Sequence, residues 1–90
     1  MRRIFTPALR DFILKTLASL HIGQSAYISE TALPNIPLKL LEMGCLPGSE
    51  VTLMQVAPLK DPLYIYVNGS HLAIRKDTAC QIEIILDLND

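Results

Sequence analysis

Alternation of hydrophobic and polar residues is the main pattern along this chain. Successive side chains of an extended strand point to opposite faces, so an apolar residue at every second position indicates a strand with one buried side. The pattern predicts five short strands, over residues 24–31, 50–57, 63–67, 71–75 and 81–88. The residues predicted to share the inner face are Ala26, Ile28, Val51, Leu53, Leu63, Ile65, Val67, Leu72, Ile74, Ile82, Ile84, Leu86 and Leu88. Those predicted to face the other way include Tyr27, Ser29, Tyr64 and Tyr66.

Helical spacing of apolar residues appears first near the N-terminus. Residues 7–15 place three apolar side chains on one helical face, namely Leu9, Phe12 and Ile13. We therefore predict an N-terminal helix, whose apolar face packs on the domain or adds a docking surface. Thr16 is expected to cap one further helical turn that ends at Leu20. These features divide the chain into a helical extension, residues 1–15, and a domain over residues 16–88.

A second short helix is predicted between the first two strands, over residues 37–43. Asn35 is the expected N-cap, and Pro37 is tolerated in the first turn because no intrahelical N–H partner is lost there. Gly44 stands where a helix ends in a left-handed residue, and Pro47-Gly48 fits a type II turn. This corner is expected to lead the helix directly into the next strand.

Asn68-Gly69 is the strongest hairpin signal in the sequence. A two-residue loop pairs Ile65 with Leu72, whereas a four-residue loop pairs Val67 with Leu72. Both registers direct the same side chains inward, so the pattern alone leaves them open. Five short strands, tight turns and a short helix between the first two strands predict a mainly β fold, a small SH3-like barrel whose closure would remove exposed sheet edges.

Composition narrows the classes of function. The chain has 90 residues, which leaves little room for a deep enzyme cleft. Its formal net charge of −1 argues against nucleic acid as a partner, because phosphate-binding surfaces usually show a basic excess. Its two cysteines, Cys45 and Cys80, are too few for a disulfide scaffold, so we interpret both as reduced, buried residues of a cytosolic protein. Charged residues interrupt every apolar stretch before the length of a membrane span or the pattern of a signal peptide is reached.

Residues that could carry chemistry are scattered. No phosphate-binding glycine loop and no CxxC, HExxH or EF-hand pattern is present, and no catalytic residue is assigned. Glu42, Cys45 and His71, with His21, are weak candidate ligands for Fe²⁺ or Zn²⁺ because nothing in their spacing marks a metal site. Two tyrosines on one outer face could stack on bases, but without a basic excess this interpretation is not favoured.

The loop between the second and third strands is a candidate recognition element. It consists of Pro58, Leu59, Lys60, Asp61 and Pro62. Its two prolines deny it helix and central-strand pairing, which makes it short and stiff. A preorganised loop binds a partner at low ordering cost, and a plain rigid connector is the competing interpretation.

The segment from Leu38 to Ile84 resembles the FeoA family, ferrous iron transport protein A. The motifs that carry the resemblance are Leu41-Glu42-Met43-Gly44, Leu46-Pro47-Gly48, Ala57-Pro58-Leu59, Asp61-Pro62, Val67-Asn68-Gly69 and Leu72-Ala73-Ile74-Arg75. With a similar opening segment, the resemblance covers residues 16–86. Lys60 departs from it, since the family usually has glycine there.

The resemblance implies an SH3-like barrel in the bacterial cytoplasm that is not an enzyme. It assists FeoB, a membrane ferrous-iron transporter with a cytosolic GTPase domain. On this basis the expected function is an accessory protein that binds the cytosolic part of FeoB and reaches the membrane only through it. The residues expected to contact the partner are Leu46, Pro47, Gly48, the loop Pro58–Pro62 and Arg75. The alternative is a transition-metal-binding sensor module. The oligomeric state stays open, a homo-oligomer included.

Overall fold

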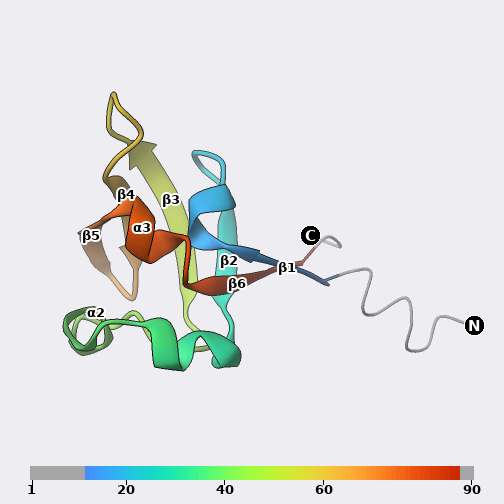
Figure 1. The fold of residues 1–90 in the computed structure, drawn as a ribbon. Coiled ribbons are helices and arrows are strands. Elements are labelled where there is room, and N and C mark those ends of the chain that lie inside the picture. The colour runs from blue at the N-terminus through green and yellow to red at the C-terminus, as the bar shows by residue number, and fades with distance from the viewer. Residues whose placement is uncertain (1–11, 88–90) are drawn as a thin grey trace, which may run out of the picture.

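The computed structural model describes residues 12–87, which form one curved antiparallel sheet with short helices (Figure 1). Six strands follow the order β1-β6-β2-β3-β4-β5. Their bounds are Phe12–Thr16 for β1, Ser25–Ile28 for β2, Glu50–Val56 for β3, Leu63–Val67 for β4, Ser70–Ile74 for β5 and Glu83–Asp87 for β6. The helices are the 3₁₀ turns η1, Leu17–Ser19, and η2, Glu30–Asn35, and the short α-helices α2, Leu38–Glu42, and α3, Lys76–Ala79.

The N-terminal helix predicted over residues 7–15 is wrong for its second half, because residues 12–15 lie in strand β1. β1 pairs antiparallel with β6, from Phe12 opposite Asp87 to Thr16 opposite Glu83. Backbone pairing with an available strand edge outweighs the helical spacing of a segment rich in β-forming residues. Leu9 and the rest of the predicted helix lie outside the described residues. The division of the chain at residues 15 and 16 stays a prediction.

The five strands predicted from alternation are confirmed, with shifted ends. β2 stops at Ile28 because the next residue, Ser29, is the N-cap of η2: its hydroxyl oxygen accepts a hydrogen bond from the Thr31 N–H, 3.2 Å away. Ser29 is buried rather than outward-facing, so that prediction is wrong. Its N–H donates to the Glu83 carbonyl oxygen at 3.0 Å, which joins the start of η2 to β6.

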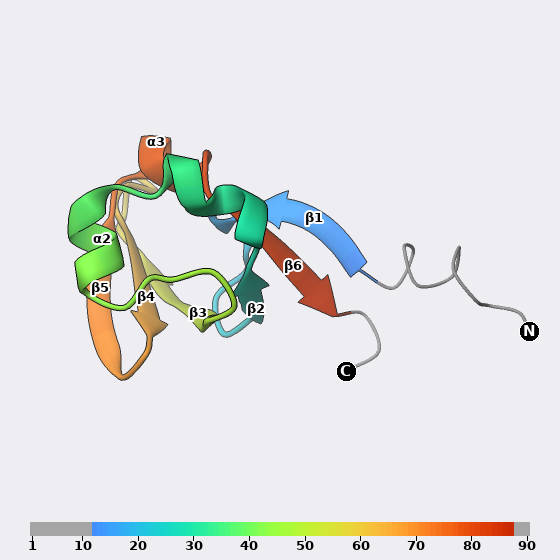
Figure 2. The same cartoon turned by 90° about the horizontal axis from the view of Figure 1, so that it is seen from below.

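The strands of residues 12–87 do not close into a full barrel. The ladder ends at β1 on one side and at β5 on the other, so the SH3-like fold is an open, curved sheet. The segment with η2 and α2 lies across one end of this sheet, and the loop after β3 extends from the opposite end (Figures 1 and 2). The two ends of the strands therefore present different loops to solvent.

The hairpin between β4 and β5 uses the two-residue loop. Val67 pairs with Ser70 and Ile65 with Leu72, which settles the register left open by the pattern. Asn68 and Gly69 both have positive φ, 51° and 79°. This combination characterises a type I′ turn, whose twist matches that of the flanking strands.

Helix α2 confirms the helix predicted between the first two strands, but not its cap. Its N-cap is Pro37, without a side-chain hydrogen bond, and Asn35 instead ends η2. Gly44 has φ of +100° and Gly48 φ of +88°, as expected of a left-handed helix end and a type II turn. The predicted corner, a left-handed helix end followed by a type II turn, is confirmed.

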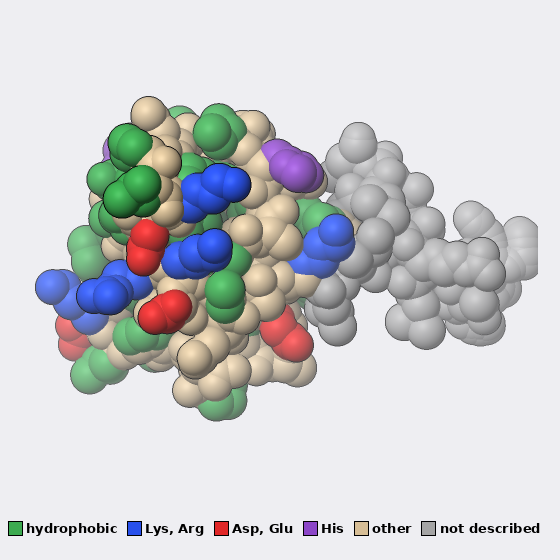
Figure 3. Space-filling model, turned by 45° about the horizontal axis from the view of Figure 1, so that its top comes forward, with side chains coloured by type: hydrophobic (Ala, Val, Ile, Leu, Met, Phe, Trp, Pro, Cys, Tyr) green, Lys and Arg blue, Asp and Glu red, His purple; other side chains and the backbone are tan. Residues whose placement is uncertain are grey.

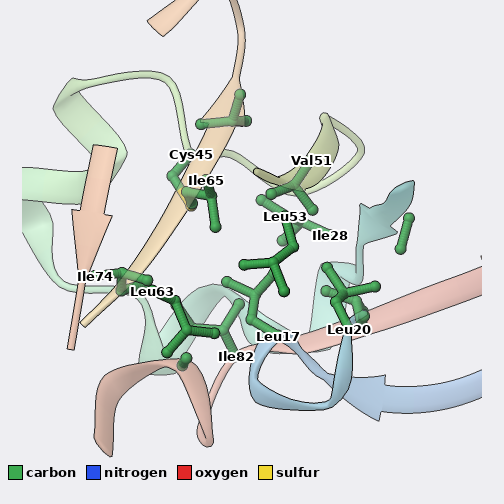
Figure 4. Close-up of a cluster of buried hydrophobic side chains, with 14 of the residues drawn as sticks. Leu17, Leu20, Ile28, Cys45, Val51, Leu53, Leu63, Ile65, Ile74 and Ile82 are labelled. Carbon is green, nitrogen blue, oxygen red and sulfur yellow. The ribbon is translucent and has the colours of Figure 1, made fainter. Parts of the chain in front are cut away.

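One continuous hydrophobic core fills the inside of the curved sheet (Figure 4). All the predicted inner-face residues that the structure describes are buried; Leu88 lies outside the described range. Further buried residues come from the helices and turns, namely Leu17, Leu20, Ala32, Ile36, Cys45 and Ala79. Each buried leucine or isoleucine stabilises the fold by about 1.5–3 kcal/mol relative to an exposed one. No helix in residues 12–87 has the length and apolar character needed to cross a membrane.

Candidate partner-binding loops

The two loops predicted to contact a partner lie at opposite ends of strand β3 (Figure 1). Leu46, Pro47 and Gly48 precede the strand, and the loop Pro58–Pro62 follows it. A strand rises about 3.3 Å per residue, so the seven residues of β3 separate the loops by about 20 Å. The structure therefore does not combine them into one small site.

The corner before β3 is held by backbone hydrogen bonds. The Gly48 N–H donates to the Ile28 carbonyl oxygen at 2.7 Å, and the Ser49 N–H donates to the Leu46 carbonyl oxygen at 3.0 Å. Leu46 remains exposed and Pro47 is half-buried. The corner thus presents an apolar side chain on a fixed backbone.

The loop after β3, Pro58–Pro62, is also closed by its own backbone. The Ala57 N–H donates to the Pro62 carbonyl oxygen at 3.1 Å, and the Lys60 N–H donates to the Ala57 carbonyl oxygen at 2.7 Å. Leu59 at its tip is 90% exposed. This loop offers a second preorganised apolar contact.

Lys60 has a left-handed backbone conformation, which is the conformation favoured by the glycine that the FeoA family usually has at this position. Its φ is +69°, within the region where a Cβ is crowded by the backbone. For a non-glycine residue this conformation costs about 1–2 kcal/mol. The loop accepts this strain and directs a charged side chain outward at that position.

Asp61 joins the loop to the start of α3. Its Oδ1 accepts a hydrogen bond from the backbone N–H of Lys76 at 2.9 Å. Arg75, the N-cap residue of α3, immediately precedes Lys76 and is exposed. Arg75 therefore belongs to the same end of the sheet as Pro58–Pro62, away from Leu46. The sequence gives no signal for this contact, because the two partners are 15 residues apart.

A shallow hollow of about 220 Å³ opens beside this loop. Its lining residues are Ala18, Leu20, Leu53, Val56, Lys60, Leu63 and Lys76, and we call it the lysine-rimmed hollow. Figure 3 shows Lys and Arg side chains gathered over α3 and the neighbouring loop, with hydrophobic side chains between them and acidic ones nearby. Sequence reasoning missed the hollow, because η1, β3, β4 and α3 contribute to it from four separate parts of the chain.

The weak metal candidates differ in accessibility. Cys45 is fully buried, and burial raises the pKa of its thiol, whereas Glu42 and His71 are exposed. His71 packs against Tyr66, with ring centroids 4.7 Å apart. Among residues 12–87, no group of three or more His, Cys, Asp and Glu side chains is arranged to hold a metal ion. The structure does not unite the three candidates.

The second cysteine corrects another expectation. Cys80 is exposed rather than buried, since it follows the last residue of α3 at the surface, and both cysteines are free thiols. The outward orientation predicted for Tyr64 and Tyr66 is confirmed, since both are exposed on the outer face of β4.

Comparison with known proteins assigns residues 15–86 to one family model, described as the FeoA domain. A curated protein of Porphyromonas gingivalis, a fusion of Fe(2+) transport protein A with the Fe(2+) transporter FeoB, is 35% identical over 71 residues. The match covers 78% of this chain but only 8% of that protein. The chain thus corresponds to a small part of the fused relative.

Solved structures agree with this match. The FeoA protein from Chlorobium tepidum is 32% identical and superposes with a TM-score of 0.68, covering 79% of this chain and 70% of that one. FeoA of Stenotrophomonas maltophilia, solved in complex with zinc and described as an SH3 domain protein, is 27% identical with a TM-score of 0.60. That match covers 77% of this chain and 87% of the other. The mainly β, SH3-like fold expected from the sequence is confirmed.

Proposed function

Because this chain belongs to the FeoA family, we propose that it is a non-enzymatic accessory protein of bacterial ferrous iron uptake. It binds the cytosolic part of an FeoB-type transporter. The observation that carries this proposal is the fused relative, in which an FeoA unit and an FeoB transporter share one polypeptide. A covalent link keeps two units at high effective concentration, whereas a separate chain needs a binding surface to reach the same association.

The exposed apolar side chains on stiff loops support such a surface. Leu46 and Leu59 lie on backbones fixed by hydrogen bonds, so little conformational freedom is lost when a partner covers them. Because the two loops lie at opposite ends of β3, a large partner contacts both, or each loop serves a different segment. The protein acts in the cytoplasm and is held at the membrane through its partner.

Binding to the cytosolic domain of the transporter from the same organism tests the proposal. Titration calorimetry, with the domain loaded with GDP or with a non-hydrolysable GTP analogue, is expected to show binding in at least one nucleotide state. Leu59→Ser is expected to weaken binding about tenfold, as for an interface anchor. Leu38→Ser is the matched control, since Leu38 is an exposed leucine on α2, outside the proposed loops. No binding in either nucleotide state would overturn the proposal.

A further inference from the structure

We propose that the lysine-rimmed hollow binds one apolar side chain of the transporter, presented by a short segment with neighbouring carboxylates. This inference rests on the proposed function and names the chemistry of the contact. The hollow is otherwise unassigned: of the predicted contact residues, only Lys60 lines it.

The size of the hollow favours a single side chain. Its volume of about 220 Å³ lies below the range of about 300–1,000 Å³ that is usual for small-molecule and cofactor sites. Five of its seven lining residues are aliphatic, namely Ala18, Leu20, Leu53, Val56 and Leu63. Leu20, Leu53 and Leu63 are buried and form the floor, so Ala18 and Val56 supply most of the apolar surface that is open to water. That surface gains free energy when another apolar group covers it. A leucine, isoleucine or phenylalanine side chain fits this requirement.

The charges at the rim select the neighbours of that side chain. Both polar residues of the lining, Lys60 and Lys76, are cationic and exposed, and Arg75 is adjacent to the second. Two acidic residues lie close in sequence, Asp61, whose Oδ1 accepts the Lys76 N–H, and Asp77, but neither is part of the lining. Ammonium groups at a rim attract carboxylates and raise the rate of association. An acidic segment therefore complements the hollow, and a basic one is repelled.

The rim is fixed before any partner arrives. Lys60 is held at φ +69° by the hydrogen bond from its N–H to Ala57, and the Lys76 backbone is held by Asp61. A strained backbone that the surrounding structure maintains is a common feature of binding sites. Leu59, 90% exposed and next to Lys60, adds an apolar contact that a free inorganic anion would not use. This contact favours a protein segment as the occupant.

The first experiment uses blocked peptides and nuclear magnetic resonance. The probe is the acetylated, amidated pentapeptide Asp-Glu-Leu-Glu-Asp, and the controls carry serine in place of the leucine, or lysine in place of all four acids. The leucine peptide is expected to shift the amide signals of Ala18, Leu20 and Leu63 at millimolar concentration, and to shift them less as salt is added. Equal shifts with the serine or lysine peptide, or none with any peptide, would overturn the inference.

The second experiment uses the transporter domain. Lys60→Glu/Lys76→Glu is expected to weaken binding about tenfold or more, since both rim charges are reversed. Lys15→Glu/Lys39→Glu is the control with the same net charge change at exposed lysines outside the hollow. Ala18→Leu fills the hollow and is expected to weaken binding as well. Ala73→Leu, at an exposed position of β5 outside the hollow, is the control and is expected to leave binding unchanged. Amide spectra confirm that each variant is folded.

The outcomes separate the two proposals. If the wild-type chain binds the transporter and both hollow variants bind equally well, this inference is overturned and the proposed function stands. If the wild-type chain does not bind the transporter, the proposed function is overturned and the inference falls with it.

Discussion

Gly44 and Asn68 approach each other so closely that the glycine has no space for a side chain. A Cβ on Gly44 would lie 2.5 Å from Asn68 Nδ2 and 2.9 Å from Asn68 Cβ. The end of α2 is thus packed against the turn between β4 and β5. Gly44 is required both for its φ of +100° and for this contact.

Gly44→Ala is expected to destabilise the protein by about 2–4 kcal/mol, the sum of left-handed strain and overpacking. Gly23→Ala is the matched control, because Gly23 has a φ of +88° but nothing within 4 Å of the added Cβ. It should lose only about 1 kcal/mol from strain. Urea denaturation measures both free energies of unfolding. Adding Asn68→Gly should recover part of the loss in the Gly44 variant, and equal losses at the two glycines would contradict the close contact.

Lys60→Gly is expected to stabilise the isolated protein by about 1 kcal/mol, because glycine adopts the positive φ without a Cβ clash. Thermal unfolding measures the change as a higher Tm. Lys39→Gly provides the comparison: in helix α2 the same substitution should cost about 1 kcal/mol, since glycine is a poor helix former. A lower Tm for the Lys60 variant would show that the left-handed backbone is not strained.

Asp61→Ala is expected to free the start of α3. The lost hydrogen bond leaves the Lys76 N–H open to water, so its amide hydrogen exchange should accelerate about tenfold or more, with a stability loss of about 1 kcal/mol. Asp61→Asn keeps an acceptor oxygen and should preserve most of the protection. Asp77→Ala removes a neighbouring carboxylate for comparison. Unchanged exchange at Lys76 in the Asp61→Ala variant would contradict the contact.

Cys45 is expected to make stability fall at alkaline pH. Burial raises the pKa of its thiol in the folded state, so above a pH of about 8.5 the unfolded chain loses this proton before the folded one does. The stability difference between wild type and Cys45→Ala should be constant below that pH and then shrink by at most about 1.4 kcal/mol per pH unit. Urea denaturation from pH 6 to 10 measures it, with Cys80→Ser as the control at an exposed thiol. A constant difference up to pH 10 would contradict a raised pKa.

Metal binding through Glu42, Cys45 and His71 together is not expected. A cysteine ligand acts as the thiolate, which burial disfavours at Cys45. Calorimetry with Zn²⁺ or with Fe²⁺ under anaerobic conditions should therefore show no one-to-one binding that Cys45→Ala, Glu42→Ala and His71→Ala each abolish. Tight binding lost in all three variants would support the sensor alternative instead.

Alternation and turn chemistry predict the fold well because both are local. The inner faces of β3 and β4 and the glycines at positions 44 and 48 followed directly from side-chain periodicity and backbone sterics. The strand β1 was missed because its conformation is determined by β6, about 70 residues later in the chain. The hollow was missed for a related reason: only the folded sheet brings Ala18 next to Lys60 and Lys76.

The position of β1 also affects where this unit can be separated from neighbouring polypeptide. The family match begins at residue 15, yet the sheet already includes Phe12. A fragment cut at residue 17 would leave β6 with a row of unpaired backbone donors and acceptors along one side, and such a row recruits strands from other molecules. Expression as an isolated fragment or in a chimaera is therefore best begun upstream of Phe12, so that the sheet keeps its outermost strand.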